Sequence, residues 1–140
     1  MADAFYVEQR NAMFGAWTHS FVDLNTDNIR IGLRDEGTTA LNLTTQVDLA
    51  DIVTALVAES SNLTGLTVGV VAAGVFDHDN VTWTAVSGAS VESLDYFKET
   101  GTDSTSPLVM NIDSATGLPV TPNGGDITFT PSGSGVVQNT

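Results

Sequence analysis

The segment FDHDNVTW holds the residue types best suited to binding a metal ion. Asp77, His78, Asp79 and Asn80 supply the oxygen and nitrogen atoms that divalent ions prefer. Adjacent residues on an extended chain point to opposite faces, so their side chains rarely converge on one ion. We interpret the segment as a tight acidic turn and expect no cofactor. Asp77 and Asp79 are metal candidates only at an oligomer axis, where several copies would contribute ligands jointly.

Other residues that could support catalysis do not form a convincing constellation. His19, Ser20 and Asp23 bring together the three types of a nucleophilic triad, but no nucleophile-elbow motif flanks them. Asp35 and Glu36 are adjacent and are typical of a solvated pair in a turn. The segment TGLTVGVVAAG lacks both the lysine and the glycine spacing of a phosphate-binding loop. The sequence therefore predicts a protein that is not an enzyme.

The charge composition restricts the possible partners. The 140 residues include 17 acids and only four basic residues, Arg10, Arg30, Arg34 and Lys98, which gives a net charge of −13. Such a surface repels both nucleic acid and anionic membranes. No apolar run approaches the ~18 residues of a membrane span, and no signal-peptide pattern opens the chain. The absence of cysteine excludes disulfides and thiolate metal sites.

Hydrophobic periodicity predicts a mainly β protein, a single domain over 1–140. The segment NIRIGLRDE alternates apolar and polar residues as a half-buried strand does, and TTQVDLADIV is typical of a brief helical turn capped by Thr45 or Asp48. DAFYVEQRNAMFGAW has the spacing of a short N-terminal helix. Turn residues every 8–12 positions favour an antiparallel β-sandwich or barrel. Further strands are predicted over 54–59, 66–71, 80–86, 93–99, 107–113 and 126–130, with a tail at 131–140 that is mobile or is ordered only against a partner.

The connection SATGLPVTPNGG is long for a β-hairpin loop. Pro119 and Pro122 fix the backbone at turn positions, and Asn123, Gly124 and Gly125 supply the positive φ values of a tight return. About twelve residues exceeds the usual two to five of a hairpin. We therefore expect a rigid loop that projects from the domain and docks on a partner.

Several motifs together resemble one known group of proteins. They are AFY at 4–6, IRIGL at 29–33, LADI at 49–52, LTGLTV at 63–68 and VTWTAVSG at 81–88, followed by the whole of 92–130. In this order they resemble a family of small virion structural proteins of tailed double-stranded DNA bacteriophages. The resemblance covers about 120 residues and ends at FTPSGSGVVQNT, where relatives continue into a final lysine-containing strand.

The resemblance implies a structural role in the virion and no catalysis. We expect a capsid decoration (cement) protein on the capsid surface, assembled in the host bacterial cytoplasm. Its partners would be the major capsid protein and further copies of itself, with a trimer favoured. The alternatives are a neck or tail component that forms a ring and, from another class, a carbohydrate- or receptor-binding module. The expected contact residues are Leu118, Pro119, Val120, Pro122, Phe5, Tyr6 and Arg10.

Overall fold

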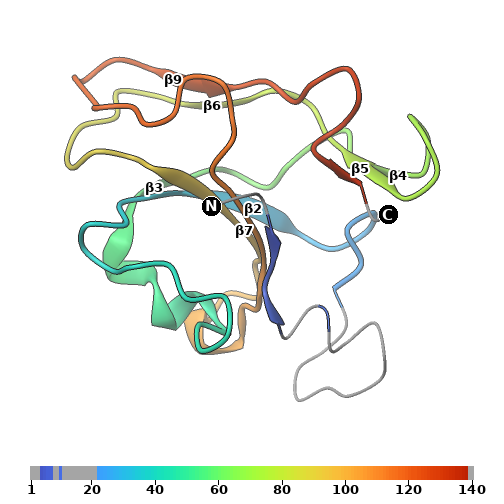
Figure 1. The fold of residues 1–140 in the computed structure, drawn as a ribbon, viewed down its shortest axis with the longest axis horizontal. Helices are drawn as coiled ribbons and strands as arrows, with labels where there is room; N and C mark the ends of the chain where they lie inside the picture. Colours follow the sequence, from blue (N-terminus) through green and yellow to red (C-terminus); the bar gives the residue numbers. More distant parts are fainter. Residues whose placement is uncertain (1–3, 8–9, 11–21, 139–140) are drawn as a thin grey trace.

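The fold is mainly β, as the sequence predicts. The computed structural model describes residues 4–7, 10 and 22–138 (Figure 1). The strands are β1 (Ala4–Phe5), β2 (Ile29–Arg34), β3 (Leu56–Glu59), β4 (Thr67–Val68), β5 (Val75–Asp77), β6 (Val81–Trp83), β7 (Ser93–Lys98), β8 (Leu108–Ile112), β9 (Ile127–Phe129) and β10 (Val137–Gln138). Within these described residues three 3-10 helices accompany the strands, η1 (Leu49–Asp51), η2 (Val53–Ala55) and η3 (Asp103–Thr105).

The strands form three antiparallel sheets. The largest has the order β1-β8-β7-β2-β3, and smaller sheets join β10-β5-β4 and β6-β9. The central pair of the large sheet runs in continuous register from Ile29 opposite Lys98 to Arg34 opposite Ser93. Within the described residues the sheets do not close into a barrel, and the predicted sandwich stays a prediction.

The two faces of the large sheet pack against different parts of the chain. On one face, the strand positions that the alternation predicts to be buried, Ile29, Ile31 and Leu33, join a core cluster with Trp83 and the partly buried Phe129. The β6–β9 pair therefore covers that face (Figure 1). On the opposite face, residues 35–55 bring η1 and η2 against the sheet, and Leu49, Ile52, Phe97, Leu108 and Tyr6 form a second cluster.

A fully buried ion pair lies on the second face. The Arg34 Nη1 atom is 2.9 Å from an Asp95 carboxylate oxygen, and both side chains have 0% exposure. Arg34 also donates to the Thr39 carbonyl and the Gln46 side chain, at 2.9 and 3.0 Å. The second cluster therefore contains a polar centre. The alternation in β2 had placed Arg34 on the polar, outward face of a half-buried strand, but residues 35–55 cover that face.

Asp95 is held by two further donors. The Tyr6 hydroxyl donates to one carboxylate oxygen at 2.6 Å, and the Asn111 amide donates to the same oxygen at 2.9 Å. Burial, with the adjacent Asp95 charge, raises the pKa of the Tyr6 hydroxyl. Tyr6 therefore stays protonated and can act as a hydrogen-bond donor to the carboxylate. The ion pair joins the N-terminal strand, the large sheet and the 35–55 segment.

Two predictions at the chain ends need correction. Ala4–Phe5 form strand β1 against β8 instead of helix. The Arg10 N–H donates to the Tyr6 carbonyl at 3.2 Å, as in one helical turn, and most of the predicted helix lies outside the described residues. Residues 131–138 do not form a tail, because β10 pairs with β5 and the Val136 N–H donates to the Phe76 carbonyl at 2.8 Å.

The helical turn predicted within TTQVDLADIV is confirmed as η1. The Asp51 carboxylate accepts the N–H groups of Val47 and Asp48, at 2.8 and 3.2 Å.

Breaking the ion pair on one side should destabilise the fold strongly. Asp95→Asn leaves the buried Arg34 guanidinium without a counter-charge, and we expect a loss of about 3–5 kcal/mol in the free energy of unfolding. The double variant Arg34→Met/Asp95→Asn should lose less than the sum of the two single variants, because it leaves no unpaired charge. Urea denaturation measures all three, and an Asp95→Asn variant within about 1 kcal/mol of the parent would contradict this account of the cluster.

Candidate functional site

Residues 115–125 lie along the protein and do not project from it. The Val120 N–H donates to the Val91 carbonyl at 2.9 Å, and the Val91 N–H donates back at 2.8 Å. Further along, Gly124 and Gly125 exchange backbone hydrogen bonds with Val86 at 2.8 and 2.9 Å. These bonds extend the β6–β9 pairing, so that residues 81–91 and 120–129 form a two-stranded ribbon. Residues 120–125 of the expected projecting loop therefore belong to one strand of this ribbon.

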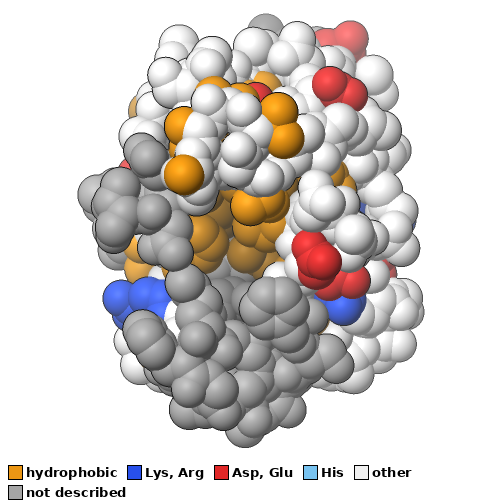
Figure 2. All heavy atoms as spheres, turned by 90° about the vertical axis from the view of Figure 1, so that its right-hand side faces the viewer, with side chains coloured by type: hydrophobic (Ala, Val, Ile, Leu, Met, Phe, Trp, Pro, Cys, Tyr) orange, Lys and Arg blue, Asp and Glu red, His pale blue; other side chains and the backbone are white. Residues whose placement is uncertain are grey.

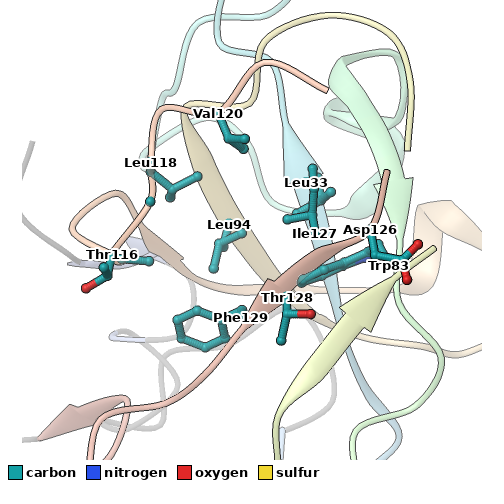
Figure 3. A pocket seen from close by; sticks show the side chains of 12 residues that line it. Leu33, Trp83, Leu94, Thr116, Leu118, Val120, Asp126, Ile127, Thr128 and Phe129 are labelled. Carbon is teal, nitrogen blue, oxygen red and sulfur yellow. The ribbon is translucent and has the colours of Figure 1, made fainter. Parts of the chain in front are cut away.

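An apolar hollow opens between this ribbon and the large sheet. It encloses about 240 Å³. Leu33 from β2 and Leu94 from β7 contribute from the sheet, and Leu118 and Val120 contribute from the 115–125 segment. Figure 3 shows Leu94, Leu118 and Val120 around a common space, with Phe129 on the opposite side. We call this space the apolar hollow; its lining residues are Leu33, Trp83, Leu94, Ala115, Thr116, Gly117, Leu118, Val120, Asp126, Ile127, Thr128 and Phe129.

The polar residues of the hollow lie at its rim. Thr116, Asp126 and Thr128 are exposed, whereas Leu33 and Leu94 are buried. Asp126 accepts the Ala85 N–H at 3.0 Å, and the Thr128 hydroxyl pairs with that of Thr82 at 2.9 Å. Both rim groups are therefore already hydrogen-bonded within the ribbon. The interior of the hollow is lined by apolar side chains and therefore offers apolar contacts to a group that enters it.

The expected contact residues separate into buried and exposed groups. Tyr6 is fully buried against Asp95 and Arg34, so its prediction as a surface contact is corrected. Leu118, Val120 and Phe5 are half-buried and pack against the first core cluster. Pro119 and Arg10 are exposed and Pro122 is half-buried. The structure therefore brings only Leu118 and Val120 together, as parts of the apolar hollow.

The acidic segment at 77–79 is hydrogen-bonded within the chain. One Asp77 oxygen accepts the His78 N–H at 2.9 Å, and one Asp79 oxygen accepts the Thr64 hydroxyl at 2.9 Å. Among the described residues, no group of three or more His, Cys, Asp or Glu side chains could hold a metal ion. Asp35 accepts the Gly37 N–H and the Thr38 hydroxyl, as in a turn, and Glu36 accepts the Ser93 hydroxyl. His19 and Ser20 lie outside the described residues.

His78 lies between the two acids in the sequence, and its side chain is buried. Its Nδ1 lies 2.6 Å from the Asp79 carbonyl, which can only accept, so Nδ1 carries the proton. In the neutral ring Nε2 then accepts from the Tyr96 hydroxyl at 2.9 Å. The ring lies 5.7 Å from the ring of Phe76 and 5.9 Å from that of Phe129. Burial lowers the pKa of His78 from 6.5, because the charged imidazolium loses its hydration there.

Sequence reasoning missed an exposed apolar turn. The predicted strand over 66–71 stops after Thr67–Val68, and the chain turns back into β5, where the Gly69 N–H donates to the Val75 carbonyl at 2.8 Å. The turn exposes three large hydrophobic side chains, Val68 at 48%, Val70 at 74% and Val71 at 45%. We call residues 68–74 the hairpin tip. The signal was present in the sequence, because no charged residue occurs between Glu59 and Asp77.

The hairpin tip lies at one end of the molecule. Figure 1 shows the turn between β4 and β5 protruding at the right-hand end, away from the β6–β9 pair. Figure 2 faces that end and shows hydrophobic side chains on the protruding lobe in its upper half. The most exposed apolar side chains and the apolar hollow therefore occupy different parts of the surface.

No protein-family model matches the chain, and a search of curated proteins gives no match. None of the helices in the described part of the chain is long and apolar enough to cross a membrane.

The buried His78 predicts a specific dependence of stability on pH. The unfolded chain takes up a proton near pH 6.5, whereas folded His78 takes it up only at lower pH. The stability that neutral His78 contributes is therefore complete above pH 6.5 and declines as the pH falls toward the folded pKa. Urea denaturation from pH 7.5 to 5.0 should show the parent losing stability relative to His78→Gln. If the difference in the free energy of unfolding between the parent and His78→Gln stays constant over this range, folded His78 does not have a lowered pKa.

Proposed function

We propose that this chain is a non-enzymatic structural protein of a tailed-phage virion, and that it decorates the capsid shell. The distribution of polar and apolar groups supports a structural role. The ion pair between Arg34 and Asp95 has no access to solvent, whereas the hairpin tip and the interior of the apolar hollow offer uncharged surface for contacts. Surfaces of this kind are suited to binding other proteins.

The placement in a virion rests on the motif resemblance described above. The charge distribution supports the outer surface of the shell. Arg30 pairs with Glu99 and Lys98 pairs with Asp27, both at 3.0 Å, so these two cations are neutralised within the chain. With Arg34 buried as well, they leave a strongly acidic molecule that packaged DNA would repel. The major capsid protein is the expected partner, with a homotrimer as the favoured oligomer.

The alternative structural role is a ring at the neck or tail. The same uncharged surfaces would serve ring contacts, so geometry alone does not separate the two positions. A carbohydrate-binding module is less well supported, because sugars stack on exposed aromatic faces. Trp83 is only 3% exposed and Phe129 is half-buried.

Labelling of purified particles tests the proposed position. Antibody against this chain, visualised with gold in the electron microscope, should label the whole shell. Label confined to the neck or tail would support the alternative position and contradict decoration. Particles without label would contradict any role as a virion component.

Removal of one exposed cation should reduce the binding of the protein to shells. Arg10 is exposed, and we expect Arg10→Gln to lower the number of copies bound per particle, because an acid on the shell loses its partner. Arg30→Gln is the matched control, since it removes the same charge from a residue that already pairs with Glu99 inside the chain. Co-sedimentation of each purified variant with undecorated shells measures the effect. Equal binding of both variants would exclude Arg10 as a contact.

A further inference from the structure

The hairpin tip and the apolar hollow are complementary. The tip is a convex surface of valine and alanine, and the hollow is a concave surface with an apolar interior. We propose that the hairpin tip of one copy inserts into the apolar hollow of a second copy and joins the copies head to tail. This inference concerns the contact between copies and holds wherever the protein lies in a particle.

The hairpin tip is more apolar than a solvated turn requires. Val70 is 74% exposed, and Ala72 and Ala73 beside it are also exposed. The nearest charged residues along the chain are Glu59 and Asp77. A contiguous exposed apolar patch on a protein with so many acids marks an interaction site, because water contact with it is unfavourable.

The size of the hollow favours an aliphatic side chain as its occupant. Its volume is about 240 Å³. Sites for drug-sized molecules are larger, about 300–1,000 Å³. Leu33 and Leu94 from the sheet and Leu118 from the 115–125 segment provide contact for isopropyl groups such as those of Val70 and Val71.

Electrostatics restricts where two copies can meet. Each copy carries a net charge of −13, so most approaches between copies are repulsive. Arg30, Arg34 and Lys98 pair within the chain, which reduces the attraction that they could offer to a second copy. A contact between the uncharged tip and the apolar interior of the hollow places few like charges close together. Added salt should therefore strengthen the association, since it screens the remaining repulsion.

The contact uses two different surfaces of the chain. The tip lies at one end of the molecule, and the hollow lies beneath the β6–β9 ribbon (Figures 1 and 3). A contact of this heterologous kind leaves an open assembly with one free tip at one end and one free hollow at the other until a closed ring forms. This property gives a sharp experimental test, because the two halves of the contact can be removed on separate molecules.

Two variants remove one half of the contact each. Val70→Asp places a charge on the tip at a highly exposed position, and Thr116→Glu places one on the exposed rim of the hollow, so neither disturbs the core. Val53→Asp is the control, because Val53 is exposed at 39% but belongs to neither surface. Sedimentation velocity over a range of concentrations, with and without 0.5 M NaCl as the added salt, measures the association of each protein.

We expect the parent and Val53→Asp to associate, with at least tenfold tighter association than Val70→Asp or Thr116→Glu. An equimolar mixture of Val70→Asp and Thr116→Glu should form a 1:1 complex, because the first retains its hollow and the second retains its tip. A parent protein that stays monomeric throughout would overturn the proposal. So would a Thr116→Glu protein that associates as the parent does, since tips would then contact tips. A mixture without the 1:1 complex would also overturn it.

Discussion

The ion pair between Arg34 and Asp95 is the interaction on which the rest of the structure depends. Neither charge reaches solvent, and burying a charge is costly unless it is paired and hydrogen-bonded. Asp95 lies opposite Gly32 on β2 and Asn111 on β8, so the carboxylate sits within a row that crosses the sheet. Gly32 contributes no side chain to this row, and a Cβ there would lie 2.7 Å from a Leu56 methyl carbon. A side chain at position 32 would therefore force the Leu56 side chain to move.

The ion pair also explains the character of the surface. One of the four cationic side chains, Arg34, is buried in it, and two more, Arg30 and Lys98, pair with acids near the ends of β2 and β7. An acidic surface remains, on which copies of the chain repel one another. Lasting contacts must then use uncharged groups, and the structure provides them at the hairpin tip and in the apolar hollow. The buried cluster and the proposed contacts are in this way two consequences of one charge distribution.

Local patterns predicted much of the fold. Strands β2, β7 and β8 follow the predicted ranges closely, because alternation and apolar content act within a single segment. The chain ends were misread for non-local reasons. Phe5 has helical spacing with later residues, yet pairing with Met110 places it in a strand, and Val137 is ordered by Phe76, which lies far away in the sequence.

The candidate site was harder to predict. The sequence indicated that the 115–125 segment is rigid. Whether the segment projects or lies along the protein depends on its pairing with Val86 and Val91, and no local signal encodes that pairing. Arg34 and Asp95 are opposite charges in two strands rich in apolar residues, which is a signal that could have indicated a buried pair. The uncharged run between Glu59 and Asp77 likewise contained the hairpin tip, although periodicity assigned its first half to a strand.

Hydrogen exchange of the free protein and of the protein on particles tests the central claim most directly. The account predicts that backbone amides of the hairpin tip and of residues 115–129 become protected on assembly. Amides of β2 and β7 should show little change, since the buried cluster protects them already in the free protein. Protection that appears instead around η3, with the tip still exchanging freely, would contradict the account.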